Sequence, residues 1–402
     1  MPQSVISPVD VAGSPPSVDV SFTRSCDDLW ELLLAVPDGR SDQGRDHPVV
    51  VVLALAAAAT VAGSRGYTAM AGWAADVPAD ILAGLYLRAG ARPGRPPSRA
   101  TIWRVCTAAD PDILDAVIAA WTTAQMPPAA GTHTQLRLDG KKVRGAVDTD
   151  GRQLHLLSAM AGPTAPGTGA HAVVIAQAPV DAAANTEPAT ARTVLESLDL
   201  TDMTVTADAM HTAKDTATLI HQRGGQFMLP VKENRRTLYD ALDRLPWADT
   251  PIAAHHTDTS HGRTTRRTIR TLPPPPGLPF PHVNQVWLIE RYVTCTRTGK
   301  QSAAAQLGVA SHTPDQADPA TLAAINRSHW AIESLHWIRD TCYREDQSRT
   351  RTRNGPRILA SLRNLAINAF RLTGRPAITE ATRWASRNMT RPFTTLGLAK
   401  RS

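Results

Sequence analysis

Cysteine is scarce in this chain of 402 residues, and the few that occur lie far apart. No two of them form a Cys-x-x-Cys pair, so the sequence indicates neither a disulfide framework nor a zinc knuckle. A reducing cytoplasm is the compartment that fits this cysteine usage best. The four cysteines are Cys26, Cys106, Cys295 and Cys342.

Long apolar runs are also missing. The longest covers residues 49–63 and follows a charged, polar stretch. A membrane-spanning helix needs about 20 apolar residues, and a signal peptide would stand nearer the N-terminus. We therefore expect a buried helix at this position and no membrane as a partner.

Acidic residues are outnumbered by basic ones, 36 against 43, and the isoelectric point lies near 9.5. A polyanion is therefore a more natural partner than an acidic protein. From Arg344 to the C-terminus, thirteen Lys and Arg face three Asp and Glu, and residues 88–104 contain five Arg and no carboxylate. A surface that follows a phosphate backbone requires such stretches, although a solvated linker can have the same composition.

The length allows two or three domains. Residues 1–25 are rich in Pro, Ser and Val without periodicity, which predicts a disordered N-terminus. Residues 26–130 have helical periodicity and predict an all-α N-terminal domain. Within it, Ser98 is expected to cap a short helix that carries Arg99 and Arg104. That helix is either a DNA contact or an ordinary surface helix.

Five short β-type runs follow, and helical segments separate the last three. Three strands, then helix, strand, helix and strand, is the order of an RNase H-like mixed sheet with flanking helices, an α/β fold. We assign this domain to residues 131–373. The runs are residues 135–139, 154–160, 173–180, 203–208 and 227–231, and the helical segments are residues 186–198 and 210–223.

An insertion at about residues 245–319 interrupts this domain. It is rich in Thr, Arg, His and Pro, and it contains two further β-type runs, residues 264–271 and 285–295. Helical spacing then returns, and the chain ends in a stretch that we expect to be a basic C-terminal tail. The helical stretches are residues 320–338 and 358–372, and the tail is residues 374–402.

Three carboxylates are the candidate catalytic residues. Asp139 follows an alternating run and precedes Gly140, where we expect the strand to end and the backbone to turn away. Asp208 ends the fourth strand, which is adjacent to the first in this topology. Glu333 lies on a helix that is expected to cross the sheet. Oxygen ligands of this kind hold two Mg²⁺ ions about 3.5 to 4 Å apart in enzymes that cut phosphodiesters.

Each of these features has a simpler explanation when it is taken alone. An Asp-Gly pair is often only a turn, and a lone Glu on a helix is usually a solvated charge. Trp330, one helical turn before Glu333, could stack on a DNA base but more simply packs against the sheet. The insertion's histidines lack companion ligands, so we expect solvated side chains rather than a metal cluster. They are His255, His256 and His261.

Six segments match motifs of a known family: residues 138–145 (LDGKKVRG), 155–159 (HLLSA), 206–212 (TADAMHT), 231–234 (VKEN), 329–337 (HWAIESLHW) and 362–366 (LRNLA). With these segments the chain resembles, over nearly its whole length, the bacterial insertion-sequence transposases of the ISAs type. Members of this family are also called H-repeat-associated proteins. The helical N-terminal part is similar to the domain that accompanies this family.

The resemblance implies a DDE transposase, an enzyme of DNA transposition and recombination. Asp139, Asp208 and Glu333 would be its catalytic triad and would ligate two Mg²⁺ or Mn²⁺ ions. Its partners would be double-stranded DNA, both the terminal inverted repeats and the target, bound by a homodimer or higher oligomer in the bacterial cytoplasm at the nucleoid. The expected DNA contacts are Lys141, Lys142, Arg144, Lys232, Arg99, Arg104, Trp330, Arg349, Arg351 and Arg353.

The sequence departs from the family pattern at a few positions. The usual Lys-x-Asn-Glu segment after the third strand is Ala183-Ala-Asn185-Thr-Glu187 here, and the family's Val-Lys-Gly-Asn-like segment has Glu233. Related transposases often have Arg four residues before the Glu and Lys seven after it, where this chain has His329 and Asp340. These departures motivate one alternative, a degenerate transposase that only binds DNA. A metal-dependent nuclease of the same fold, which cuts without rejoining, is a further alternative that the sequence separates poorly from a transposase.

Overall fold

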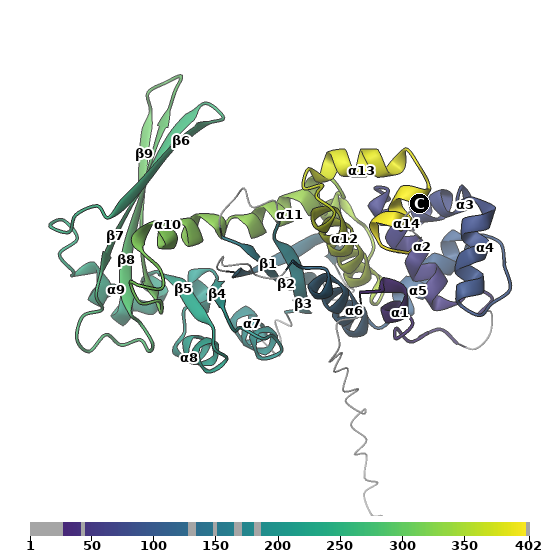
Figure 1. Cartoon of the computed structure of the whole chain (residues 1–402), viewed down its shortest axis with the longest axis horizontal. Helices are drawn as coiled ribbons and strands as arrows, with labels where there is room; N and C mark the ends of the chain where they lie inside the picture. The colour runs from purple at the N-terminus through teal and green to yellow at the C-terminus, as the bar shows by residue number, and fades with distance from the viewer. Residues whose placement is uncertain are drawn as a thin grey trace, which may run out of the picture.

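The computed structural model describes residues 27–41, 45–127, 134–147, 151–164, 171–180 and 186–398. A helical region, a central sheet and a long antiparallel extension follow one another along the longest axis of the molecule (Figure 1). The expected disordered segment, residues 1–25, lies outside the described residues. In the described part, no helix combines the length and the apolar composition that crossing a membrane requires.

The helical region is built around α2 (Val49–Val61), which is apolar on all sides and almost completely buried. A helix of this kind belongs in the interior of a bundle, and the predicted buried helix is confirmed. Ser98 Oγ accepts a hydrogen bond from the Thr101 amide, so it caps its helix as expected. The surrounding helices are α1 (Leu29–Leu33), α3 (Tyr67–Ala75), α4 (Ala79–Arg88), α5 (Arg99–Ala108) and α6 (Pro111–Ala124).

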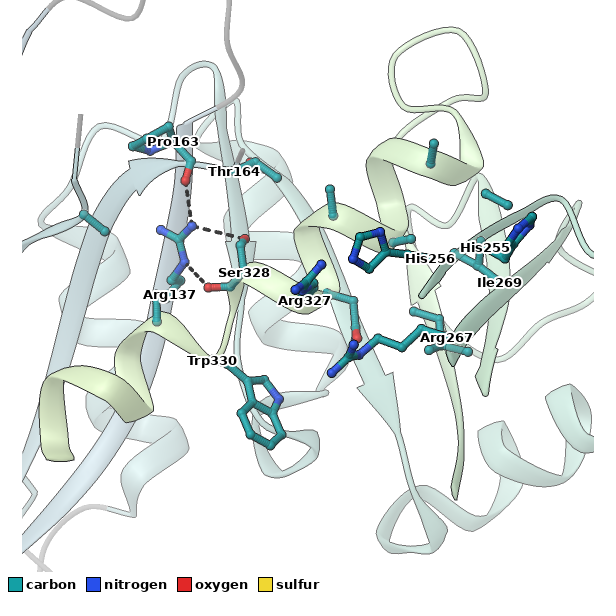
Figure 2. Close-up of a pocket in the computed structure, with 18 of the residues that line it drawn as sticks. Arg137, Pro163, Thr164, His255, His256, Arg267, Ile269, Arg327, Ser328 and Trp330 are labelled. Carbon is teal, nitrogen blue, oxygen red and sulfur yellow. Dashed lines mark hydrogen bonds between the residues drawn. The ribbon is translucent and has the colours of Figure 1, made fainter. Parts of the chain in front are cut away.

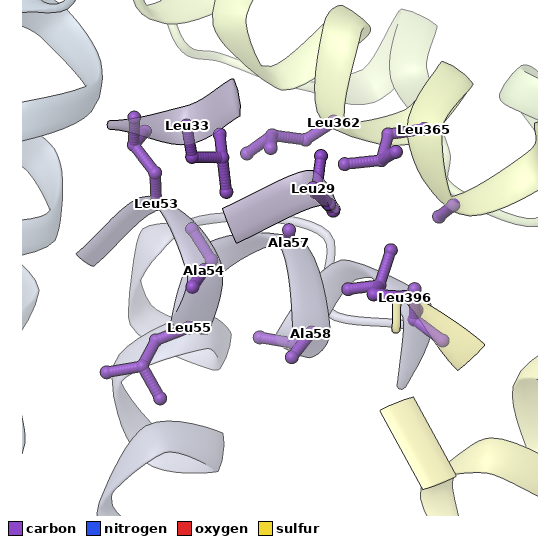
Figure 3. Packing of buried hydrophobic residues seen from close by; sticks show 14 of the residues in the cluster. Leu29, Leu33, Leu53, Ala54, Leu55, Ala57, Ala58, Leu362, Leu365 and Leu396 are labelled. Atoms are coloured by element: carbon purple, nitrogen blue, oxygen red, sulfur yellow. The ribbon is translucent and has the colours of Figure 1, made fainter. Parts of the chain in front are cut away.

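The C-terminal part of the chain completes this helical core. Leu362 and Leu365 of α12 (Gly355–Leu372) pack in one cluster with Leu29 of α1 and the alanines of α2 (Figure 3). The expected basic tail contains α13 (Ile378–Ser386) and α14 (Thr390–Thr395), and their apolar residues are buried in the same cluster. Two basic residues of this segment, Arg383 and Arg391, lie on these helices.

The central strands have the predicted RNase H-like order, β3-β2-β1-β4-β5, in which β1, β2 and β3 are antiparallel and β4 and β5 run parallel to β1. The strands are β1 (Thr134–Val147), β2 (Gln153–Pro163), β3 (Val173–Pro179), β4 (Met203–Thr206) and β5 (Gln226–Val231). The connecting elements are α7 (Glu187–Glu196), η1 (Ala209–His211), α8 (Lys214–Gln222), η2 (Glu233–Arg235) and α9 (Arg236–Asp243).

The insertion continues the same sheet, because β9 pairs antiparallel with β5 and the order runs on as β5-β9-β8-β7-β6. The two expected strands are β7 (Arg263–Leu272) and β8 (Gln285–Cys295). The sequence analysis missed β6 (Ala254–Ser260) and β9 (Gln301–Ala310). Gly308 of β9 leaves room for the Trp287 ring of β8, which an added Cβ would overlap.

Two helices, α10 (Pro319–Ser328) and α11 (Ala331–Thr341), lead back from the extension across the sheet towards the helical region (Figure 1). The sequence predicted one helical stretch here, but the chain breaks between the two helices at His329 and Trp330. The short helix η3 (Glu345–Gln347) follows. The carboxylate of Glu345, the first residue of η3, is fully buried between the guanidinium groups of Arg339 and Arg363.

Candidate active site

Asp139 and Asp208 lie side by side on neighbouring parallel strands. The register pairs Arg137 of β1 with Thr206 at the end of β4, and each Asp stands two residues further along. Asp208 was expected to end the fourth strand; β4 ends two residues earlier, at Thr206, and Asp208 is the N-cap of η1. The expectation that a strand ends at Asp139 was wrong, because β1 pairs with β2 well beyond Gly140. The Asp139 side chain instead becomes accessible where its neighbour β4 stops.

Glu333 approaches the same place from above the sheet, on the first turn of α11, which packs on β1. Burial raises the pKa of its carboxyl, and the negative charges of Asp139 and Asp208 raise it further. The structure thus places two of the predicted residues on adjacent strands, β1 and just after β4, and the third on the helix that packs on β1.

Two histidines, neither of which the sequence analysis placed in the site, lie among these carboxylates. His336 Nδ1 is 3.2 Å from Asp139 Oδ2, and His329 Nδ1 is 3.0 Å from the Thr206 hydroxyl oxygen. Burial lowers the pKa of His329, which favours its neutral form. Their spacing from Glu333, four residues before it and three after it, was the available signal, because these positions share one helical face.

A second group missed from the sequence lies beside Asp139. Glu187 of α7 accepts hydrogen bonds from His155 of β2, at 3.0 Å, and from His211 of η1, at 3.1 Å. Burial opposes ionisation of Glu187, but these two hydrogen bonds outweigh it and lower its pKa to about 2. The pair His155–Glu187 lies directly against Gly140, where an added Cβ would overlap both side chains. This network joins β2, α7 and η1 behind the two aspartates.

Lys141 differs from the other expected phosphate contacts. Its side chain is 8% exposed, and its ammonium group donates to Asp340, at 2.7 Å, and lies 3.3 Å from Asp346. Asp340, which stands where related transposases often have Lys, is therefore paired with a cation from β1. Lys142 and Arg144 are exposed on the same strand.

A cavity of about 1210 Å³ opens beside Asp208. Lys232, just after β5, and Trp330, at the break between α10 and α11, both line it and are exposed. The other predicted DNA contacts lie elsewhere on the surface. Arg99 and Arg104 are exposed on α5, and Arg349, Arg351 and Arg353 are exposed between η3 and α12.

The carboxylates have the right chemistry for divalent metal ions, because Mg²⁺ and Mn²⁺ prefer oxygen ligands. In the described residues, however, no three His, Cys, Asp or Glu side chains are spaced closely enough to hold one ion. The donor set fits a metal in its chemistry and charge.

Comparison with known proteins gives matches along most of the chain. A family described as "Transposase DDE domain" matches residues 101–369, and one described as "DDE_Tnp_1-associated" matches residues 30–122. The chain therefore belongs to the family of transposases with a DDE domain, as the sequence motifs predicted.

Two curated relatives come from Escherichia coli. The protein named "H repeat-associated putative transposase YhhI", from strain K12, is 24% identical over 85% of this chain and 89% of its own length. "Putative transposase YncI", from O157:H7, is 28% identical over 59% of this chain, and the match spans about three fifths (61%) of its length.

A solved structure, the piggyBac transposase synaptic complex with hairpin DNA, is 10% identical with a TM-score of 0.41. The match covers 91% of this chain and 76% of that one, and a likeness this distant carries no information on activity.

Proposed function

We propose that this protein is an active DNA transposase that binds the ends of its own insertion sequence. It cuts a strand to free a 3′-hydroxyl and directs that hydroxyl at a phosphate of the target DNA. The observation that supports this proposal is the approach of Asp139, Asp208 and Glu333 to one another from β1, β4 and α11. Phosphoryl transfer depends mainly on positioning and charge stabilisation, which such a site can supply.

In this proposal the three carboxylates hold two Mg²⁺ or Mn²⁺ ions, which activate the attacking oxygen and stabilise the leaving oxygen when bound. His336 holds the Asp139 carboxylate from the side of α11. Lys232, exposed in the cavity beside Asp208, contacts a phosphate close to the scissile bond. Lys142 and Arg144 contact the DNA backbone further along the same DNA strand.

The partners in this proposal are the two terminal inverted repeats and the target duplex. Pairing two ends requires at least two copies of the chain on DNA, so the working form is a homodimer or a higher oligomer. The exposed arginines of α5 and of the segment before α12 would hold parts of the duplex away from the reaction centre. They would contribute affinity and no sequence selection by themselves.

Nicking of DNA that carries the element's own ends tests the proposal. With Mg²⁺ or Mn²⁺, the parent chain should nick this DNA, and Asp208→Asn should lower the rate by about a thousandfold or more. Asp215→Asn, on the exposed surface of α8, is the matched control and should nick at the parent rate. Equal rates for the parent chain and Asp208→Asn would refute the assignment.

A second function, DNA binding without catalysis, is favoured by one observation. No three potential ligands in the described part of the chain are spaced for a metal ion. Calorimetric titration with Mn²⁺ discriminates between the two functions, because the transposase must bind the ion and the degenerate protein need not. Heat of binding that disappears in Asp208→Asn supports the transposase.

A further inference from the structure

A second cavity, of about 560 Å³, adjoins the one that contains Asp208. Arg267 of β7, Arg327 of α10 and Trp330 line both cavities. The second cavity lies between α10, the hairpin of β6 and β7, and the edge formed by Arg137 and Pro163 (Figure 2). It is large enough for a nucleotide-sized group.

The charged side chains of this lining are all cations. Arg137, Arg267 and Arg327 line the cavity among alanine, isoleucine and other uncharged residues. No Asp or Glu is among its described lining residues, whereas the neighbouring cavity contains Asp208, Glu233 and Asp243. Cavities lined by one sign of charge attract ligands of the opposite sign. Three histidines also line the cavity: His171, His255 and His256.

The buried Arg137 and the half-buried Arg371 add positive charge, and both donate to backbone carbonyl oxygens. Arg137, 1% exposed, donates to the carbonyl oxygens of Ser328 and Pro163 at 2.7 and 2.9 Å, and Arg371 donates to the carbonyl of Ala172 at 2.6 Å. Neither has an acidic partner among the residues that the structure describes. Burial lowers the pKa of both groups to about 10, so both stay charged at neutral pH.

Burying a cation without a counter-charge is unfavourable in a protein interior. Such a charge is retained most readily where an anion from outside compensates it. Arg137 lines the cavity itself, and Arg371 is hydrogen-bonded to the carbonyl of Ala172, another lining residue. Their field adds to that of the exposed cations around the opening.

In this structure, a single carboxylate oxygen pairs with the cations at the junction of the two cavities. Asp258 Oδ2, on β6, lies 2.8 Å from Arg267 Nη1, 3.2 Å from Arg327 Nη2 and 3.9 Å from His256 Nε2. Two guanidinium groups, from β7 and α10, and an imidazole ring of β6 thus converge on one oxygen. This is the arrangement that also binds an oxygen of a phosphate.

We propose that the basic cavity binds the phosphate backbone of a DNA strand beside the scissile phosphate, and that Asp258 occupies part of this site until DNA displaces it. The inference rests on the proposed function, since the ligand is the same DNA. The inference adds a specific binding site for the DNA strand at the extension. Arg267 and Arg327, which line both cavities, connect this place to the reaction centre.

The test is equilibrium binding of a labelled duplex to the full chain in EDTA, measured by fluorescence anisotropy over a series of salt concentrations. Arg267→Gln and Arg327→Gln should each weaken binding by about fivefold to tenfold. Each should also lower the slope of log affinity against log salt by about 0.9, the value for one lost phosphate contact. Circular dichroism confirms that each variant is folded.

Arg266→Gln is the matched control, because it removes the same charge from the same strand at an exposed position outside both cavities. It should leave the slope close to that of the parent chain. Equal losses in Arg266→Gln and Arg267→Gln would mean that only net charge matters, and would overturn the proposed site.

Asp258→Asn should change DNA affinity in the opposite direction, because it removes the carboxylate that competes with DNA phosphate and leaves the arginines in place. It should strengthen DNA binding by about threefold to tenfold at low salt. Unchanged or weaker binding would contradict the role of Asp258. Displacement of the duplex by micromolar dAMP would assign the cavity to a free nucleotide and would also overturn the proposal.

The design separates this inference from the proposed function. Binding in EDTA requires no cleavage, so the arginine pattern can hold even if Asp208→Asn nicks DNA at the parent rate. In that case the cavity remains a DNA site and the catalytic assignment is lost. If instead the parent chain nicks DNA as predicted but the arginine variants do not differ in DNA binding, the catalytic assignment holds and the cavity is not a DNA site.

Discussion

The two halves of the nine-stranded sheet differ in burial and in charge. Strands β1 to β5 are covered by helices, and seven successive residues of β2 are buried. Strand β6, at the far edge of the extension, has no fully buried residue. The candidate catalytic acids belong to the buried half and its covering helix α11, whereas the extension presents Arg267 and the two adjacent histidines to the basic cavity.

This difference separates two tasks within one continuous sheet. The buried half and its covering helix hold acidic groups, and burial together with the charges of Asp139 and Asp208 raises the pKa of Glu333. The extension carries cations at its outer strands, of which β6 has no buried residue. A long, highly charged ligand such as DNA can contact both halves at once.

Breaking the buried ion pairs should have the largest effect and gives the sharpest contrast between the halves. Burial opposes ionisation of Glu345, but the charges of Arg339 and Arg363 lower its pKa to about 2. Glu345→Gln should therefore lower the free energy of unfolding by about 3 to 5 kcal/mol. The comparable change in the extension, Asp258→Asn, breaks partly exposed pairs and should cost less than about 1 kcal/mol.

Urea unfolding of both variants measures this difference directly. If Asp258→Asn destabilised the protein as much as Glu345→Gln, the extension would be as tightly held as the buried half. The contrast drawn between the two halves would then fail.

The next effect concerns the packing behind the aspartates. Gly140→Ala places a Cβ against the Glu187 carboxylate and the His155 ring, so either these two side chains or β1 must move next to Asp139. We expect nicking to slow by about tenfold to a hundredfold, because small displacements of catalytic groups are costly. Gly84→Ala, on α4 with open space around it, is the control and should leave nicking unchanged. Parent-like nicking by Gly140→Ala would show that this packing does not position Asp139.

A smaller, pH-dependent effect is expected at Glu187. Its folded pKa of about 2 is lower than the ordinary value of 4.5, so its stabilising contribution is complete above about pH 4.5 and is lost as the pH falls towards 2. Glu187→Gln should be less stable than the parent chain by about 1 to 2 kcal/mol near pH 6. The difference should shrink as the pH is lowered to about 3, as thermal unfolding at several pH values will determine. A constant difference at all pH values would contradict this explanation.

Much of the buried half was predictable from its sequence. The runs of β-branched and aliphatic residues gave all five central strands, and their order with the helices gave the RNase H-like topology. Asp139 and Asp208 could be paired because strand adjacency follows from that topology. The family of the chain followed from motifs around the same residues.

The rest depended on contacts that leave little trace in a single sequence. Strand β6 (Ala254–Ser260) is polar on both faces, so no alternation identified it. The end of β1 was misplaced because Asp139-Gly140 resembles a turn, whereas Gly140 serves the close approach of Glu187. The cations that meet at Asp258 come from segments that are far apart in the chain, and only folding brings Arg327 to the hairpin.

The central claim is that three carboxylates act together on DNA, and joining of labelled element ends to a target duplex tests it most directly. With Mg²⁺, the parent chain should give covalently joined product, and Glu333→Gln should give about a thousandfold less or none while still binding the duplex. Joined product from Glu333→Gln at the parent level would contradict the account.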